Sequence, residues 1–332
     1  NRNMLSEGAE WQLGEFIYET LEGRPGTYTQ HYPKATRRGL NKVWFERYSE
    51  GDVWDSWLFR GETAAGVGEK NYMFEIRVFK TVKRIDFVHL LRKKLETAPE
   101  AVYVSFPFEL PDGKIFYDVP GGAIQAGIDQ IPGSSNDWNN IQNFATVRNS
   151  DGQMLMGSQE VSLAQFGGIN NGRFQRDATP ETNNIYSWPM NNYWNTNFNA
   201  DQHGEFEWTY FLTSSADNSL EYATRFAWGA RIPMPTRVLQ AGKSERKGAT
   251  SGSILELTPG NLLLVNMRPV EGEKAVLLQI REIGGKSTVF NATSPLLGAL
   301  HFESCDATGK PIEQPEPITF KPWENKFIKI KW

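Results

Sequence analysis

Two segments of the sequence combine aromatic rings with Asn, Asp and Gln, the side-chain types that are common in sugar-binding sites. Sugar sites stack the apolar C–H face of the ring on aromatic side chains and bind its hydroxyls through Asn, Asp and Gln. The segments 129–140 and 191–199 are the two longest polar–aromatic connections of the chain, and both are rich in Asn. The candidate carbohydrate-binding or domain-interface residues are Asp129, Gln130, Asp137, Trp138, Asn191, Asn192, Tyr193, Trp194, Asn195 and, just beyond them, His203.

Three interpretations of these two segments remain open. Their Asn and Asp side chains can hold the loops themselves, the loops can pack against another domain, or they can contact sugar directly. Each aromatic side chain left in water forgoes roughly 1.5–3 kcal/mol of burial, so something must cover Trp138, Tyr193 and Trp194. We expect both loops to face a domain outside this sequence and to approach its cleft together.

Motifs for catalysis or metal binding are not found in the sequence. The four histidines, His31, His89, His203 and His301, are far apart and lack a spacing such as His-Glu-x-x-His. His89 has apolar neighbours on a predicted strand, which favours a hydrogen-bonded core histidine over a ligand. There is no Gly-x-Ser-x-Gly elbow, P-loop or dinucleotide fingerprint. We therefore predict no catalytic residue and no metal site within this chain.

Composition favours a β-rich protein. Of the 332 residues, 13% are aromatic, and the 30 Gly and 18 Pro often bound apolar runs. A net charge of −4 without a long Lys/Arg run argues against a nucleic-acid surface. No apolar segment approaches the roughly 20 residues that span a bilayer, so no membrane partner is expected. Cys305 is the only cysteine, which excludes an intrachain disulfide and a Cys-based zinc site.

Short strands alternate with Gly, Pro, Asn and Asp turns along most of the chain. Pro107, in the predicted strand 102–108, indicates an edge strand or a bulge. The best helix candidate is Ser219–Trp228, with Asp217 and Asn218 placed to cap it. The clearest alternation of apolar and polar residues predicts strands at 72–78, 83–91, 102–108, 141–147, 154–163 and 206–212.

The sequence divides near residue 240. Ala241–Gly252 is rich in Gly, Ser and Lys, which predicts a linker or a long surface loop. Short strands at regular spacing follow it and indicate a small β-sandwich. We predict one domain at residues 1–240 and a second at residues 241–332.

A series of stretches, in their order along the chain, carries a family resemblance. They are Trp11–Glu19, Glu75–Leu91, Glu100–Phe108, Asp129–Gly133, Ile141–Val147, Asn191–Phe198, Leu262–Arg268, Leu277–Gly284 and Pro322–Ile330. Together they resemble the β-rich C-terminal half of family 38 glycoside hydrolases, the retaining α-mannosidases, and the resemblance covers most of the chain rather than one motif. It implies an all-β fold: a galactose-mutarotase-like β-supersandwich followed by a smaller C-terminal β-sandwich.

The resemblance also implies that the chemistry lies outside this chain. Family 38 enzymes hold zinc with Asp and His ligands in an N-terminal α/β domain, where one carboxylate is the nucleophile and a second is the acid/base. The implied role here is non-catalytic, with that α/β domain of the same protein and an α-mannoside as partners. Residues 1–4 look like neither a signal peptide nor a natural start, so we expect a fragment or a processed chain. Three locations remain open: the bacterial periplasm, the extracellular space and the cytoplasm.

Two alternatives belong to other functional classes. A mutarotase-type aldose epimerase would need a catalytic His and a Glu facing one sugar, and the scattered histidines weigh against it. A stand-alone carbohydrate-binding module would need only the polar–aromatic loops. Epimerase activity lost on His203→Ala would favour the first, and glycan binding by the isolated chain would favour the second.

Overall fold

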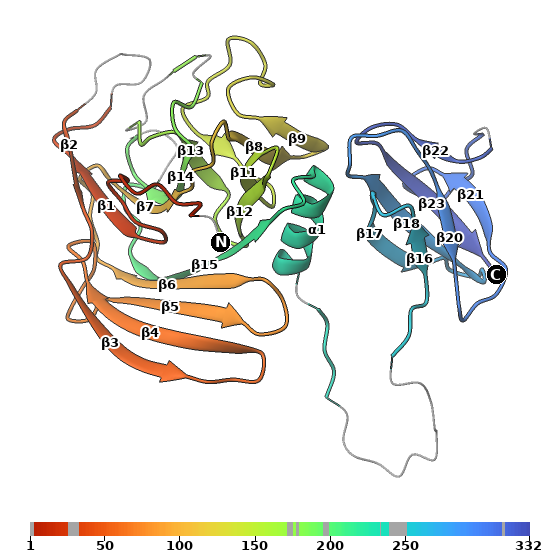
Figure 1. The fold of residues 1–332 in the computed structure, drawn as a ribbon, viewed down its shortest axis with the longest axis horizontal. Coiled ribbons are helices and arrows are strands. Elements are labelled where there is room, and N and C mark those ends of the chain that lie inside the picture. Colours follow the sequence, from red (N-terminus) through yellow and green to blue (C-terminus); the bar gives the residue numbers. More distant parts are fainter. Residues whose placement is uncertain are drawn as a thin grey trace. The chain divides into compact units, whose positions relative to one another are not determined.

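The computed structural model describes residues 3–25, 33–170, 175–176, 179–194, 199–232, 234–238, 251–313 and 316–332. They form 23 strands and one helix (Figure 1), and the chain divides into two compact units. Unit 1 comprises Asn1–Asn218 and Phe226–Arg231, and unit 2 comprises Ser219–Arg225 and Ile232–Trp332. The all-β prediction, a β-supersandwich followed by a smaller β-sandwich, is confirmed.

The larger sheet of unit 1 has nine antiparallel strands. Its first four strands form a meander of successive hairpins, drawn in orange in Figure 1. The spatial order is β3 (Lys42–Ser49), β4 (Trp54–Glu62), β5 (Tyr72–Phe79), β6 (Ile85–Lys93), β15 (Gly204–Ser215), β12 (Gly152–Ser158), β11 (Ala145–Asn149), β8 (Lys114–Val119) and β9 (Gly122–Gln125).

The second sheet of unit 1 has six strands, and β7 lies at its centre. All eight residues of β7 are buried, because it pairs with β1 on one side and β14 on the other. The expectation that Pro107 marks an edge strand or a bulge in its own strand is therefore wrong. Pro107 is the last residue of β7, where a missing N–H interrupts no further ladder bond. The spatial order is β10 (Asn139–Asn140), β13 (Leu163–Phe166), β14 (Asn184–Asn191), β7 (Glu100–Pro107), β1 (Phe16–Leu21) and β2 (Ala35–Arg38).

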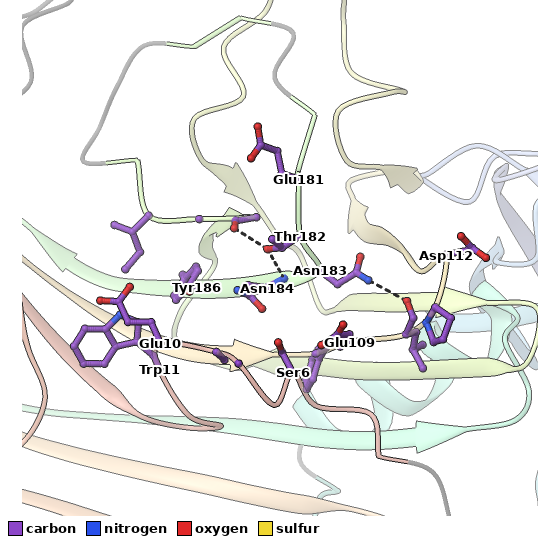
Figure 2. Close-up of a pocket in the computed structure, with 18 of the residues that line it drawn as sticks. Ser6, Glu10, Trp11, Glu109, Asp112, Glu181, Thr182, Asn183, Asn184 and Tyr186 are labelled. Atoms are coloured by element: carbon purple, nitrogen blue, oxygen red, sulfur yellow. Dashed lines mark hydrogen bonds between the residues drawn. The ribbon is translucent and has the colours of Figure 1, made fainter.

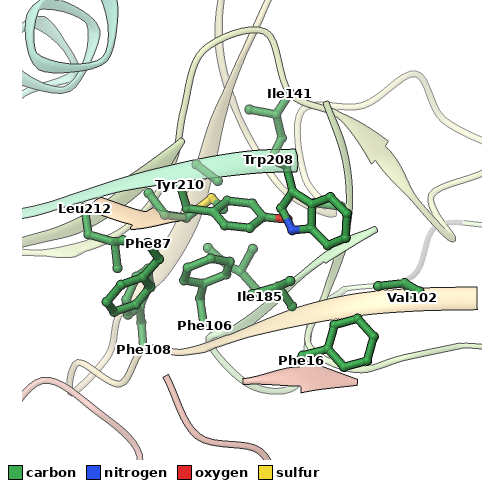
Figure 3. Packing of buried hydrophobic residues seen from close by; sticks show 14 of the residues in the cluster. Phe16, Phe87, Val102, Phe106, Phe108, Ile141, Ile185, Trp208, Tyr210 and Leu212 are labelled. Atoms are coloured by element: carbon green, nitrogen blue, oxygen red, sulfur yellow. The ribbon is translucent and has the colours of Figure 1, made fainter. Parts of the chain in front are cut away.

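The main hydrophobic core lies between these two sheets. Phe106 of β7 and Tyr210 of β15 point toward one another, with ring centroids 5.0 Å apart (Figure 3). Trp208 and Leu212 join Tyr210 on the buried face of β15, as the alternation of residues 206–212 predicts. The period of two along each strand thus fixes which side chains enter the core.

His89 is part of this core. Its ring is fully buried beside Phe74, Trp208 and Tyr210, and Nδ1 hydrogen-bonds the Tyr72 hydroxyl. Nε2 has no hydrogen-bond partner in the part of the chain that the structure describes. Burial lowers the pKa of His89 from 6.5 to about 3, so the ring is neutral near pH 7. The prediction of a hydrogen-bonded core histidine is confirmed.

A second cluster covers the opposite face of the six-stranded sheet. Tyr103 of β7 stacks against Trp188 of β14 with centroids 5.8 Å apart and nearly parallel rings. Ile17, Tyr186 and Tyr193 complete its buried part. Because successive side chains of β1, β7 and β14 alternate between faces, these strands supply both clusters.

Unit 2 has its own core between small sheets. Leu278, Ile280 and Ile328 are among its fully buried residues, and the thiol of Cys305 is free. The predicted linker Ala241–Gly252 lies almost wholly outside the described residues. The sheets are β17 (Leu262–Pro269), β18 (Ala275–Glu282), β23 (Asn325–Lys331) and β21 (His301–Cys305); β16 (Glu256–Thr258) with β20 (Asn291–Thr293); and β19 (Thr288–Val289) with β22 (Thr319–Phe320).

The helix α1 (Leu220–Arg231) confirms the predicted helix and runs three residues further. The expected caps are wrong, because the Ser219 hydroxyl accepts the hydrogen bond of the Tyr222 N–H at 3.1 Å and is the N-cap. Asn218 instead donates its amide to the carbonyl of Asn149 at 2.6 Å. No helix among the described residues has the length and apolarity needed to cross a membrane.

Candidate functional site

The two predicted loops lie together on the outer face of the six-stranded sheet. The rings of Trp138 and Trp194 are 5.4 Å apart, and Trp188 of β14 lies 5.7 Å from the first and 6.3 Å from the second. Both loop tryptophans are partly buried against this cluster. The structure therefore brings segments 129–140 and 191–194 together and covers their aromatic rings largely with the chain's own core.

Tyr193 is the centre of a buried polar network. Its hydroxyl donates to Oε1 of Glu19 and lies 2.8 Å from the hydroxyl of Tyr103. The other oxygen of Glu19 accepts a hydrogen bond from Nε of Arg37 at 2.7 Å, so the buried carboxylate is paired with a cation. Burial and the nearby Glu19 raise the pKa values of both tyrosines well above the ordinary range. Tyr193 therefore links the loop at residues 191–194 to β1 and β7. Because it is fully buried, a sugar cannot reach it.

Asn192 ties its loop to the segment before β7. Its Oδ1 accepts the N–H of Glu100 at 2.7 Å, and its Nδ2 lies within 3.0–3.2 Å of the carbonyls of Glu96, Ala98 and Ala200. The residue is only 2% exposed. Every polar atom of this side chain has a partner inside the protein, so Asn192 holds the loop in place.

The loop at 129–140 is also held by its own side chains. Oδ2 of Asp129 accepts the N–H of Gln125 at 2.8 Å, which closes a turn. Gln130 donates to Oδ1 of Asn139 at 2.7 Å and accepts the N–H of Gly127 at the same distance. These bonds fix the orientation of the Gln130 side chain.

Asp137 is a buried carboxylate rather than an exposed one. It accepts hydrogen bonds from the Ser135 hydroxyl at 3.1 Å and from the N–H of Gln175. Its own carbonyl accepts a bond from the Asn170 amide. Burial raises the pKa of Asp137 above its ordinary value, and the hydrogen bonds offset part of that shift.

The remaining candidates are dispersed. Asn191 ends β14 opposite Ala101 and is half-buried. His203 is exposed, and its Nδ1 hydrogen-bonds the carboxylate of Asp201. Asn195, like His31, lies outside the described residues. No described contact joins His203 to the two loops.

A pocket of unit 1 lies where β7 ends and β14 begins. It has a volume of about 610 Å³, and its walls come from segments 6–11, 108–112 and 181–186 (Figure 2). The Thr182 hydroxyl donates to the carbonyl of Gly167 at 2.8 Å, and the Asn183 amide donates to that of Leu110 at 3.3 Å. These bonds tie segment 181–186 to two other parts of the lining, at Gly167 and at Leu110.

The polar pocket, as we call this cavity, combines aromatic rings with carboxylates. Trp11 and Tyr186 line one end. The indole N–H of Trp11 is buried and has no hydrogen-bond partner in the described ranges. Burial raises the pKa of Tyr186, so its hydroxyl stays protonated. The carboxylates on the lining, which form no ion pair among the described residues, are Glu10, Glu109, Asp112 and Glu181.

A second pocket of about 810 Å³ shares a wall with the polar pocket. Gly167, Gly168 and Ile169 line both. Gln130 and Asp137 line the second pocket, and a further cavity of about 580 Å³ is lined by Asp129, Gln130 and Trp138. Part of loop 129–140 therefore borders open space, as a binding loop must.

The polar pocket was missed by sequence reasoning. Its walls come from segments far apart in the sequence, and they meet only because β7 pairs with strands from both sides of it in the sequence. Trp11 lies before the first strand of unit 1, because β1 begins at Phe16. The local signal that existed was the polar, Gly-containing stretch from Gly167 to Asn184.

The described residues contain no group of three or more His, Cys, Asp or Glu side chains that could hold a metal ion. The carboxylates of the polar pocket are spread over its rim. The arrangement suits hydrogen bonding to hydroxyl or cationic groups with an aromatic ring at one end, which is the chemistry of a sugar-binding surface.

Comparison with known proteins finds this fold in larger solved structures. A protein in glycosyl hydrolase family 38 from Enterococcus faecalis matches 95% of this chain with 40% of its own, at a TM-score of 0.70 and 12% identity. An α-mannosidase from Enterococcus faecalis V583 matches 96% of this chain with 38% of its own, at a TM-score of 0.71 and 12% identity. The expected resemblance to family 38 is confirmed at the level of the fold. No family model and no curated protein matches the sequence.

Proposed function

We propose that this chain is the C-terminal β-rich region of a longer, family 38-like α-mannosidase. The observation that carries the proposal is the fold match: nearly the whole chain corresponds to about two fifths of each of two family 38 structures. A match of that extent is what a large region of such a protein would give. The remainder of the parent protein would then contain the catalytic α/β domain.

The role we assign to this chain is support of that catalytic domain. The zinc ion that the family implies does not fit the described residues, because they hold no suitable group of ligands. Asp137, Asn192 and Tyr193 are buried and hydrogen-bonded within the chain, so they stabilise the fold rather than act on a substrate. Zinc, the nucleophile and the acid/base would therefore reside in the catalytic domain.

The polar pocket is the surface that we assign to carbohydrate. Trp11, which is only partly buried, offers its ring at one end of the pocket, and the carboxylates along the lining, which form no ion pair among the described residues, accept hydrogen bonds from hydroxyls. Its position beside loop 129–140 would let one wall of a cleft in the parent protein be completed from this chain. No described observation favours the epimerase alternative, since His89 is buried and no histidine lines either pocket.

The test compares this chain with the product of its complete gene. We expect no hydrolysis of an aryl α-mannoside by the purified chain, with or without added zinc, and zinc-dependent hydrolysis by the complete product. Calorimetric titration with methyl α-mannoside tests the pocket, where Trp11→Ala should weaken binding at least tenfold and Trp44→Ala, outside the pocket, should not. Zinc-dependent turnover by the isolated chain, or a complete gene product without α-mannosidase activity, would overturn the proposal.

A further inference from the structure

The outer edge of the nine-stranded sheet is open. β3 is the terminal strand in the sheet order and pairs only with β4 among the described residues. Figure 1 shows it as the outermost of the orange strands. An edge strand presents a row of backbone N–H and C=O groups that can pair with another strand. β3 has eight residues, seven of them exposed, so this edge is long and accessible.

One face of this edge carries an aromatic ladder that starts in the core. Phe87 is 5% exposed, and the rings of Phe74, Phe59 and Phe45 follow it outward across successive strands at centroid separations of 5.4, 6.4 and 5.6 Å. At the outer end Phe45 is 59% exposed. The same row of packing that stabilises the core thus ends on an uncovered ring.

Neighbouring side chains extend the uncovered end into a patch. Val43 lies two residues before Phe45 on the same face and is 57% exposed. A bulge between Phe45 and Arg47 returns Tyr48 to that face, where it packs on Trp57 at 5.2 Å and stays half exposed. An apolar cavity of about 340 Å³ begins beside Val43 and Phe59 and continues the patch inward. Contiguous apolar surface of this kind marks a contact site.

We propose that this edge pairs with the same edge of a second copy of the chain. In an antiparallel pair, two residues that face each other either both direct their N–H and C=O groups at the partner strand or both direct them away from it. A two-fold axis between identical strands must therefore pass midway between one residue and the same residue of the copy. For β3 we compare three registers, in which Val43, Trp44 or Phe45 is the residue that faces its own copy across the axis.

Charge selects one of these registers. Pairing centred on Trp44 sets Lys42 opposite Glu46 of the copy, and two-fold symmetry repeats that pair. It also sets Val43 opposite Phe45, so the apolar patches of the two copies meet. The register on Val43 places Lys42 opposite Trp44, and the register on Phe45 places Glu46 opposite Trp44. Only the central register joins opposite charges and apolar side chains at once.

The two charges remain available for this pairing. Lys42 already contacts Glu62 at 3.4 Å and Glu46 contacts Arg60 at 2.5 Å, which holds both on one face of the sheet. The side chain of Lys42 is still 66% exposed and that of Glu46 is 41% exposed. Charges and a bulge ordinarily protect an edge from pairing. Here the charges have opposite signs and are spaced so that the strand is complementary to itself.

One strand pair buries less surface than a standard interface, so the dimer is reversible. We expect a dissociation constant on the order of 10–100 µM. Sedimentation velocity of the whole chain at increasing concentration measures it. Lys42→Glu and Glu46→Lys each create two like-charge pairs across the axis and should raise the constant at least tenfold. The double variant Lys42→Glu/Glu46→Lys restores opposite charges and should return it to within about threefold of the original.

The rescue separates pairing from folding. The double variant does not restore the contacts with Glu62 and Arg60, so recovery of the dimer can come only from the other copy. Glu69→Lys makes the same charge change at an exposed position off the strand edge and should leave the constant unchanged. A chain that stays monomeric throughout, a dimer insensitive to both single variants, or a double variant without rescue would each overturn the proposal.

Discussion

Acid should destabilise unit 1 through His89. The folded protein holds this ring neutral down to about pH 3, whereas the unfolded chain protonates it below its ordinary value of 6.5. Between these values the unfolded state binds the extra proton, so the free energy of unfolding falls as the pH falls. The contribution is fully present above pH 6.5. At pH 5, which is 1.5 units lower, the loss is about 2 kcal/mol.

A matched variant isolates this effect from the carboxylates. His89→Phe keeps an aromatic ring in the core but leaves the Tyr72 hydroxyl without its acceptor, so Tyr72→Phe is combined with it. Urea unfolding is measured at pH 8 and at pH 5 for both proteins. The original chain should lose about 2 kcal/mol more than the double variant over that interval.

The two units can unfold separately, so the transition must be assigned. The transition whose midpoint the double variant moves belongs to unit 1, which contains His89. Equal losses for the two proteins between pH 8 and pH 5 would refute the reasoning, because they would mean that His89 is protonated in the folded protein.

Two further predictions concern the loop at residues 191–194. Trp194→Ala should lower the free energy of unfolding by roughly 3 kcal/mol, because Trp138, Trp188 and Tyr193 surround that ring. Urea unfolding measures the loss, and Trp44→Ala on the exposed edge is the control. An equally small loss of stability in both variants would place Trp194 outside the core. Tyr193→Phe should cost about 2 kcal/mol by leaving Glu19 with one fewer donor. A Tyr193→Phe protein as stable as the original would contradict the network.

Local patterns predicted several strands and the meeting of the two loops, but residues 154–163, expected as one strand, divide between β12 and β13. The alternation at residues 206–212 is a property of neighbours in sequence, and Trp138 does contact Trp194. Burial of Asn192 and Tyr193 could not be anticipated, because Glu19 and Glu100 reach them from distant strands. The same limit explains why the polar pocket was missed. Carbohydrate contact at Gln130 and Trp138 stays a prediction.

The position of β7 has a consequence for how the chain is made. Its neighbours in the sheet are β1, synthesised long before it, and β14, synthesised long after. Both pairings close long loops, which slows folding. While a ribosome is between residues 107 and 184, a strand that is apolar on both faces has only one of its two partners. Nascent chains of that length should therefore be the most prone to aggregate and the most dependent on chaperones.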